Sequence, residues 1–315
     1  MTNDNKNLDV HFAKETKVLL NNEPFRFRYD VKGEFGKVET KGLIRRGKYD
    51  FRFEINARTS TKFKNEAMMI VRLLKNQSPR VIRIFNQGEV NGIKYLLTTP
   101  VGKSLSEILK LFPNLDAHTY VHIMLQTFLC IRDVHYAQSA HFDVQPSSFS
   151  IKIDEPKVII FSSFHISTFL KHVYDNEQEL KSKIPPITRY SSRRQHKGDR
   201  YGRADDFESW IYMIYEIVHN EPVKWAKIKH PLEMLRKKMT FLKTYSSTTK
   251  NVEKKMRYMI DVIFSCNIIN AEDVDDLLYK VIIDWYNSAT INGKDYPWEE
   301  LYVMQPAHTV VKNSK

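Results

Sequence analysis

Two short stretches of this 315-residue chain concentrate polar groups that could take part in group-transfer chemistry. Residues 141–149 read HFDVQPSSF, and residues 159–167 read IIFSSFHIS. Asp143 is the one carboxylate in the two stretches, and a carboxylate can accept the proton of an attacking hydroxyl. Several of the other polar residues are serines, whose hydroxyls are neutral and poor ligands for a small hard cation that prefers carboxylates. The residues therefore offer a candidate base without an acidic metal site beside it.

Both stretches resemble the active-site core of protein kinases, which reads H-R-D-V-K-P-S-N-F in the first and ends in D-F-G-L-S in the second. By this resemblance Asp143 takes the position of the catalytic aspartate, which accepts the proton of the substrate hydroxyl. Gln145 replaces the lysine that contacts the transferred phosphate, while Ser148 and Ser163 replace the two metal ligands. The nearest other acids, at residues 154–155, fall in a predicted turn between two strands. We therefore do not expect them to replace the lost ligands.

Other positions keep residues that kinases use for structure. His141 and Phe164 match two residues that stack across the two lobes, and Asp206 matches the buried aspartate that anchors the catalytic loop. Phe142 replaces the loop arginine whose charge in many kinases interacts with a phosphorylated activation loop. If the second stretch is aligned one residue earlier, Ser162 takes the metal-binding position, which is still not a carboxylate. The resemblance implies a preserved scaffold, in which the lone catalytic-loop aspartate is expected to be structural.

The resemblance extends to the segment in which such kinases bind nucleotide. VKGEFGKV at residues 31–38 keeps two of the three loop glycines, which let the backbone approach phosphates closely. Arg52 takes the position of the nucleotide-binding lysine, and Glu66 that of its ion-pair partner, so an Arg52–Glu66 pair is one expectation. A solvated Glu66 is the alternative. Val101 would offer its backbone N–H to an adenine. The residues assigned to the nucleotide are Gly33, Gly36, Arg52, Glu66, Thr99 and Val101.

Three motifs narrow the resemblance to the casein kinase 1 superfamily. ITRYSS at residues 187–192 resembles G-T-x-R-Y-A-S, and ADDFESW at residues 204–210 resembles R-D-D-L-E-S-[LW]. DYPWEE at residues 295–300 resembles the Y-D-W-E close of tau-tubulin-kinase-like relatives, a branch expanded in nematodes. Relatives of casein kinase 1 recognise acidic or phosphorylated substrates through a basic pocket, because guanidinium groups pair with phosphate oxygens. The candidate phosphate-binding residues here are Arg189, Arg193 and Arg194, with a solvated basic loop as the alternative.

Hydrophobic periodicity predicts helices where the resemblance needs them. Apolar residues recur at steps of three and four over residues 121–134 and 207–218, and Asn220 and Pro222 are predicted to end the second helix. We expect an α+β, bilobal protein-kinase-like fold, with a small antiparallel-sheet N-lobe carrying one main helix and a larger, mostly helical C-lobe. The predicted divisions are a polar tail at 1–22, the domain at 23–302 with an N-lobe at about 23–99, a hinge at about 99–103 and a C-lobe at about 104–302, and a polar tail at 303–315.

Composition bounds the remaining possibilities. The chain has 49 lysines and arginines against 37 acidic residues, a net charge of +12. The basic residues are spread along the sequence without interleaved aromatics, which does not favour a nucleic-acid site. No apolar run reaches the roughly 18–20 residues that span a bilayer, and the polar start does not resemble a signal peptide. We expect a soluble protein of the cytoplasm or nucleus. Cys130 falls in an apolar helical stretch and is predicted to be a buried free thiol.

Three hypotheses of function follow. The main one is a casein kinase 1-like pseudokinase, closest to the tau-tubulin-kinase-like branch, that acts as a protein-binding or regulatory module. The second is an atypical active serine/threonine kinase that uses Asp143, and the third is a phosphopeptide-binding module centred on Arg189. We expect protein partners, with phosphorylated or acidic segments as candidates, and no membrane. The main hypothesis requires no cofactor, and it leaves open weak binding of ATP without magnesium through Arg52 and the hinge.

Overall fold

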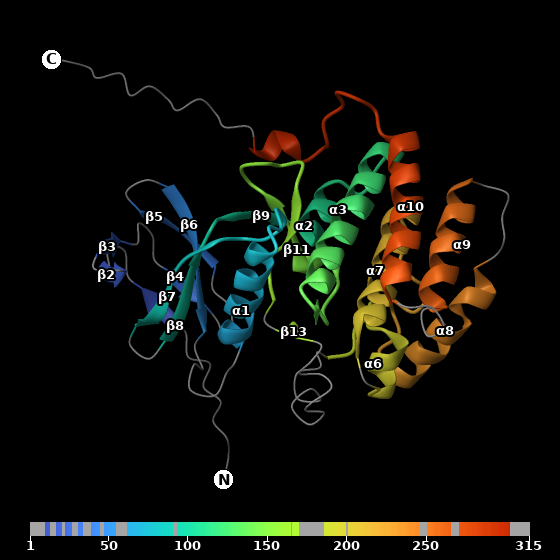
Figure 1. Ribbon diagram of the computed structural model, residues 1–315, viewed down its shortest axis with the longest axis horizontal. Helices are drawn as coiled ribbons and strands as arrows, with labels where there is room; N and C mark the ends of the chain where they lie inside the picture. Colours follow the sequence, from blue (N-terminus) through green and yellow to red (C-terminus); the bar gives the residue numbers. More distant parts are fainter. Residues whose placement is uncertain are drawn as a thin grey trace, which may run out of the picture.

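The computed structural model divides into a β-sheet lobe formed by about the first hundred residues and a helical lobe formed by the rest (Figure 1). It describes the backbone of residues 10–12, 17–20, 23–26, 31–33, 39–44, 47–54, 62–90, 93–164, 166–169, 186–199, 201–245, 251–265 and 271–302, and side chains only from residue 66 onward. This arrangement confirms the predicted α+β class, with an antiparallel sheet in the smaller lobe.

The N-terminal lobe is built on a six-stranded antiparallel sheet in the order β2-β3-β5-β6-β8-β7. Its strands are β2 (Lys17–Leu20), β3 (Glu23–Arg26), β5 (Glu39–Ile44), β6 (Gly47–Glu54), β7 (Ile84–Val90) and β8 (Ile93–Thr98). A separate antiparallel pair joins β1 (Val10–Phe12) to β4 (Val31–Gly33). Strands β1 and β2 lie within the segment predicted as a polar tail, because strands of three and four residues give only a weak periodic signal.

One long helix accompanies this sheet, as the sequence predicted. Helix α1 (Lys62–Lys75) contacts β8 and turns Met69, Ile70 and Leu73 into the core. These positions follow the three- and four-residue steps of one helix face. Glu66 is buried on the same face, so the predicted alternative of a solvated glutamate is wrong.

The C-terminal lobe is a packed set of helices. Its helices are α2 (Leu105–Leu111), α3 (Ala117–Tyr136), α6 (Arg193–Lys197), α7 (Arg203–His219), α8 (Pro231–Thr244), α9 (Asn251–Phe264) and α10 (Ala271–Ala289). Helix α3 packs against both α7 and α10, and Figure 1 shows α3 and α10 side by side. The indole N–H of Trp210 donates to the hydroxyl of Thr127 at 2.9 Å in the middle of this contact. The two predicted helices are confirmed, and α7 ends at Asn220 in a left-handed conformation.

Short strands connect the lobes and hold the loops of the cleft. A three-stranded sheet has the order β12-β11-β9 and contains β9 (Val101–Ser104), β11 (Phe149–Lys152) and β12 (Ile159–Phe161). The antiparallel pair of β11 and β12 confirms the predicted turn at 154–155. The remaining elements are β10 (Ser139–Ala140), β13 (Thr168–Phe169), and the short helices η1 (Pro146–Ser148) and η2 (Glu299–Tyr302).

Two further sequence expectations concern cysteines and membranes. Cys130 is a buried free cysteine on α3, and burial raises the pKa of its thiol. Cys266 lies outside the described residues. No helix in the described part of the chain has the length and apolarity to cross a bilayer.

Candidate active-site cleft

One buried carboxylate, that of Asp206 on α7, anchors the backbone of the loop at residues 141–149. It accepts hydrogen bonds from the backbone N–H groups of His141 (2.7 Å) and Phe142 (3.0 Å) and from the hydroxyl of Tyr201 (3.0 Å). The imidazole of His135 lies 3.1 Å away. Burial alone would raise the pKa of Asp206, but the bond to His135 and the other donors outweigh it and lower this pKa. The loop is thus fixed by an ionised side chain from another helix.

His141 joins this loop to the second stretch. Its ring stacks on Phe161 with centroids 3.9 Å apart and meets the edge of Phe164 at 5.7 Å. Its Nε2 donates to the carbonyl of Ser163 at 2.8 Å, and its Nδ1 accepts from the backbone N–H of Asp143 at 3.3 Å. One nitrogen that donates and one that accepts define a neutral imidazole. Burial accordingly lowers the pKa of His141.

Asp143 lies half-buried, with its neighbours turned toward it. The side-chain amide of Gln145 donates to Oδ1 of Asp143 at 2.7 Å, and the hydroxyl of Ser148 donates to the backbone carbonyl of Asp143 at 2.5 Å. The carbonyl of Ser148 accepts in turn from the backbone N–H of Ser162 at 2.9 Å. The structure therefore brings together Asp143, Gln145, Ser148 and the 162–163 segment, and these residues form hydrogen bonds with one another.

Phe142 has an unusual backbone, with a φ of 72°. A non-glycine residue in this left-handed region carries strain of order 1–3 kcal/mol, and the surroundings must hold it there. Its ring is buried in a small cluster with Ala140 and Tyr201, meeting the Tyr201 ring edge-on at 4.2 Å, and Ile166 packs against the cluster. Sequence reasoning did not find Tyr201, which supports both Phe142 and Asp206. Phe142, which the sequence resemblance aligns with the loop arginine of kinases, is thus part of an apolar contact.

The residues assigned to the nucleotide are only partly described. Gly36 lies outside the described residues, and Gly33 ends β4 opposite Val10 of β1. Arg52 lies in β6 with its backbone between Glu39 and Leu96, but its side chain is outside the described part. Glu66 is buried on the inner face of α1. The Arg52–Glu66 ion pair therefore stays a prediction.

The connection between the lobes shows a contact that the sequence did not indicate. Thr99 is tied to Arg83, since its N–H donates to the Arg83 carbonyl at 2.9 Å and its hydroxyl accepts from the Arg83 N–H at 3.1 Å. Val101 is buried at the start of β9. Two residues later, the N–H of Lys103 donates to the hydroxyl of Tyr302 at 2.7 Å. The last described residue of the chain thus braces the predicted hinge.

No family model matches the chain. It is 27% identical over 210 residues to the Caenorhabditis elegans protein ZK507.1, which carries a provisional serine/threonine-protein kinase name, covering 64% of this chain and 61% of that protein. A second C. elegans protein with such a name, ZK507.3, is 26% identical over 205 residues, covering 64% of this chain and 50% of that protein. The serine/threonine-protein kinase MPS1 of Saccharomyces cerevisiae is 26% identical over 172 residues, or 51% of this chain and 22% of that kinase. The chain has a protein-kinase-like fold. Its matches span half to three-fifths of the two nematode relatives.

A kinase-like fold implies a magnesium–nucleotide site, so the donor groups of the cleft can be tested against that metal. By the family pattern the two ligand positions hold Ser148 and Ser163, and the Ser148 hydroxyl is turned to a backbone carbonyl. Magnesium is held in proteins mainly by carboxylates, phosphates and water. Among the described residues no three His, Cys, Asp or Glu side chains gather as a metal-binding group. These side chains do not fit the ion.

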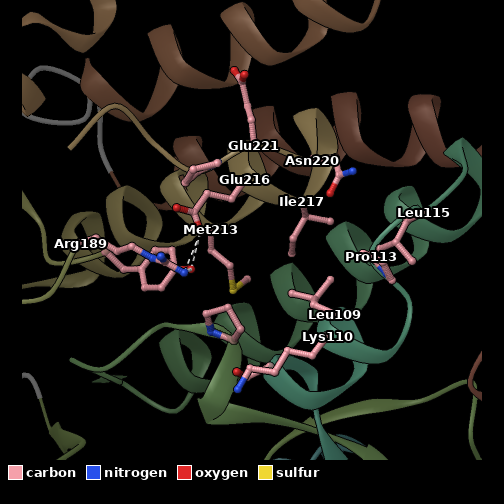
Figure 2. Close-up of a pocket in the computed structure, with 14 residues that line it drawn as sticks. Leu109, Lys110, Pro113, Leu115, Arg189, Met213, Glu216, Ile217, Asn220 and Glu221 are labelled. Atoms are coloured by element: carbon pink, nitrogen blue, oxygen red, sulfur yellow. Dashed lines mark hydrogen bonds and ion pairs between the residues drawn. The ribbon is translucent and has the colours of Figure 1, made fainter. Parts of the chain in front are cut away.

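The arginines predicted to bind phosphate lie in two places in this kinase-like chain: Arg189 lines one cavity, and Arg193 and Arg194 line another. Arg189 makes an ion pair with Glu216 at 3.2 Å, and Figure 2 shows the two side chains facing each other. Arg193 is paired with Glu208 at 3.0 Å and lies over an aromatic ring. Arg194 lines a small cavity of about 90 Å³ beside α6. The sequence missed both glutamates, because they face inward from α7 and give no separate signal.

A larger cavity of about 310 Å³ opens beside Arg189, between α2 and α7 (Figure 2). Its apolar lining includes Leu109, Met213 and Ile217, and Pro146 of the 141–149 loop borders it. Its charged lining residues are of both signs: Lys110, Arg189, Glu216 and Glu221. The cavity can hold an apolar side chain next to the loop, and its mixed charge selects no single sign of ligand.

Proposed function

We propose that this kinase-like chain is a catalytically impaired relative of casein kinase 1, of the tau-tubulin-kinase-like branch, that acts as a protein-binding or regulatory module. The hydrogen bonding of Asp143 carries the proposal. One oxygen of this carboxylate accepts from the neutral amide of Gln145, at the position where kinases place a lysine charge. The hydroxyl of Ser148 is turned to the backbone of the same residue.

The energetic argument rests on what phosphoryl transfer requires. The reaction depends on positioning and on neutralising charge with metal ions and basic groups rather than on covalent chemistry by the protein. Metal-based charge stabilisation is worth several kcal/mol, and a loss of about 4 kcal/mol already slows a reaction roughly a thousandfold. Serines in place of two metal ligands and an amide in place of a lysine remove these contributions together. The proposed module requires no cofactor, and ATP is bound weakly without magnesium through Arg52 and the hinge.

The scaffold supports binding as the retained role. Asp206 accepts hydrogen bonds from two backbone N–H groups of the loop, and the ring of His141 contacts that of Phe164. These bonds keep the loop in one shape without any of the charges that transfer needs. A surface of fixed shape is what protein recognition requires, because a pre-ordered site loses less entropy on binding.

A transfer assay tests the proposal directly. Purified wild type and Asp143→Asn are incubated with radiolabelled ATP and either Mg²⁺ or Mn²⁺, with casein and phosphorylated peptides as acceptors. We expect the two proteins to label the acceptors equally, at background level. Labelling by wild type that Asp143→Asn abolishes would overturn the proposal. Melting curves with ATP are expected to show the same small shift with and without metal.

The second candidate, an active serine/threonine kinase, is favoured by Asp143 itself. Its side chain is half-buried at the position of the base, and its backbone is held by His141. This candidate predicts that ATP and metal together raise the melting temperature more than ATP alone. Equal melting temperatures would count against it, whatever the acceptor offered.

The third candidate, a phosphopeptide-binding module, is favoured by the exposure of Arg189. This side chain is 44% exposed at the edge of the 310 Å³ cavity, although a phosphate would have to compete with Glu216 for it. Arg189→Glu is then expected to weaken capture of phosphorylated peptides relative to their unphosphorylated forms. Lys224→Glu, an exposed charge reversal outside the cavity lining, is the matched control. Equal capture by wild type and Arg189→Glu would refute this candidate.

A further inference from the structure

Helix α1 is apolar on two faces. One face, with Met69, Ile70 and Leu73, is buried in the core. The other carries Val71 and Leu74, whose side chains are 48% and 37% exposed. A surface helix of a soluble protein normally has one apolar stripe and one polar face. The second apolar stripe of α1 is therefore a surface suited to binding a group other than the described residues of this chain.

Val71 of this stripe borders a groove between α1 and the strand β7. The groove has a volume of about 810 Å³, and its apolar lining includes Met68, Val71, Ile84 and Phe85. Phe85 is 49% exposed. Binding sites commonly have volumes of about 300–1,000 Å³, and exposed apolar patches on monomers often mark interaction sites. We call this surface the α1–β7 groove; it lies in the N-terminal lobe, away from the catalytic loop.

The charge of the groove indicates the sign of what it binds. Its charged lining residues are Arg72 and Lys75, both in the last turn of α1, and no acidic side chain lines it among the described residues. The whole chain carries a net charge of +12, which favours the approach of acidic partners. A partner that places a carboxylate opposite Lys75 gains an ion pair at the rim of an apolar contact.

We propose that the α1–β7 groove docks an acidic amphipathic segment of a partner protein, whose apolar side chains fill the space between Val71 and Phe85 while its carboxylates face Lys75. The groove follows α1 from Ala67 to Asn76, about 14 Å at the rise of an α-helix. This length matches two to three helical turns of the partner. The bound segment would thus contact the helix that also carries the buried Glu66. The inference holds whether or not the cleft transfers phosphate.

Peptide selection tests the chemistry of the partner. A display library of random 14-residue peptides is selected on the full-length protein, and enriched peptides are synthesised with a fluorescent label for polarisation measurements. We expect the enriched sequences to share a net negative charge and apolar residues spaced three or four apart. Val71→Glu and Phe85→Ser should each weaken their binding at least about tenfold. Lys75→Glu should weaken it severalfold, and so should added salt, because it screens the exposed charges.

Leu232→Glu is the matched control, because Leu232 is an equally exposed apolar side chain on α8, at 59%, outside the groove. It should leave peptide binding unchanged. Val71 is half-exposed, so Val71→Glu should fold and melt close to wild type; Phe85→Ser provides a second, chemically different change of the same surface. The absence of enriched peptides, enrichment of basic or uncharged peptides, or equal binding by Val71→Glu would each overturn the proposal.

Two other occupants are distinguished by further measurements. Sedimentation of wild type as a dimer that Val71→Glu converts to a monomer would show that a second copy covers the groove, and the proposal would fail. The thiol of Val71→Cys, located by mass spectrometry, is expected to react with a maleimide as fast as a free surface thiol. Protection of that thiol in the isolated monomer would assign the groove to another segment of the same chain, which also overturns the proposal. None of these readouts depends on kinase activity, so they fail or succeed independently of the proposed function.

Discussion

Asp206→Asn is the most informative single change, because four donors converge on one buried carboxylate. Oδ2 accepts from the His141 N–H and faces His135, while Oδ1 accepts from the Phe142 N–H and the Tyr201 hydroxyl. An asparagine keeps one oxygen but turns an NH₂ group toward a backbone donor. If that group takes the place of Oδ1, the tyrosine hydroxyl can rotate to accept from it, and the N–H of Phe142 is left unsatisfied.

The magnitude follows from that geometry. One buried unsatisfied donor costs about 1–3 kcal/mol, and bonds to a neutral oxygen are weaker than bonds to a charged one. We expect Asp206→Asn to lower the free energy of unfolding by about 2–4 kcal/mol. Unfolding in urea, followed by the fluorescence of the four tryptophans, measures it. With a slope of about 3 kcal/mol per molar urea, the midpoint should fall by about 0.7–1.3 M.

Asp284→Asn is the control, since its carboxylate is 75% exposed and paired with Lys255 on the surface. Such a pair contributes about 0–1 kcal/mol, so its midpoint should move by less than about 0.3 M. The pKa of Asp206 is lowered in the folded state, so its contribution is present above the unfolded pKa of about 3.9 and is lost as the pH falls through the folded pKa. The gap between wild type and Asp206→Asn should therefore narrow below about pH 4. Equal midpoint shifts for the two variants at pH 7 would refute the anchoring argument.

Three further changes test other parts of the cleft and its supports. Gly102→Ala should destabilise the protein by about 1–3 kcal/mol, because the Cβ of the alanine would lie 2.5 Å from the Tyr302 hydroxyl and 2.9 Å from a backbone carbonyl of β11. Adding Tyr302→Ala should recover only part of this stability, since the clash with the carbonyl remains. Full recovery, measured by unfolding in urea, would contradict the carbonyl clash. Ser148→Asn combined with Ser163→Asp should make the stabilisation by ATP, measured as a rise in melting temperature, depend on magnesium. If magnesium adds nothing to that rise, the assignment of these two positions as lost metal ligands is contradicted. Burial lowers the pKa of Lys238 from 10.5 to about 7. Between these two pKa values the unfolded chain binds more protons than the folded one, so this group destabilises the fold at and below pH 7 and the destabilisation fades as the pH rises. In wild type the free energy of unfolding should therefore rise by up to about 1.4 kcal/mol per pH unit between pH 7 and 9, and Lys238→Met should remove this rise. Equal pH slopes of the unfolding free energy for wild type and Lys238→Met, measured with urea, would contradict this prediction.

Much of the fold could be predicted because the spacing of apolar residues along a helix shows which of its faces is buried. The apolar steps over residues 207–218 place one face of α7 in the core, and Asn220 ends the helix as its residue type indicates. The antiparallel pair around residues 154–155 was predicted for the same reason, from apolar runs on either side of a turn. These signals are local, so a single sequence is enough to find them.

The contacts that decide the candidate site are not local. Glu216 lies 27 residues after Arg189, and Glu208 lies 15 residues after Arg193, on a helix whose period shows which face is buried but not which arginine meets it. Tyr302 reaches the hinge from 199 residues away. A sequence shows that such polar groups exist, but their partners depend on the packing of separate elements. In the folded protein Arg189 and Arg193 therefore pair with different glutamates, while Arg193 and Arg194 line one small cavity.

Phe142 and Asp206 together explain how the loop keeps its shape although its chemical groups differ from those of kinases. The backbone of Phe142 is held at a positive φ by two kinds of contact: its N–H donates to Asp206, and its ring packs against Tyr201. None of these contacts uses Asp143 or Gln145, so the identities of those residues are free to change without unfolding the loop. A lysine at position 145 would therefore change the charge beside Asp143 and replace the amide hydrogen bond to it, while the contacts of Phe142 with Asp206 and Tyr201 would remain. The shape of this loop thus depends on contacts of His141 and Phe142 with Asp206 and Tyr201, whereas its chemistry depends on Asp143 and Gln145.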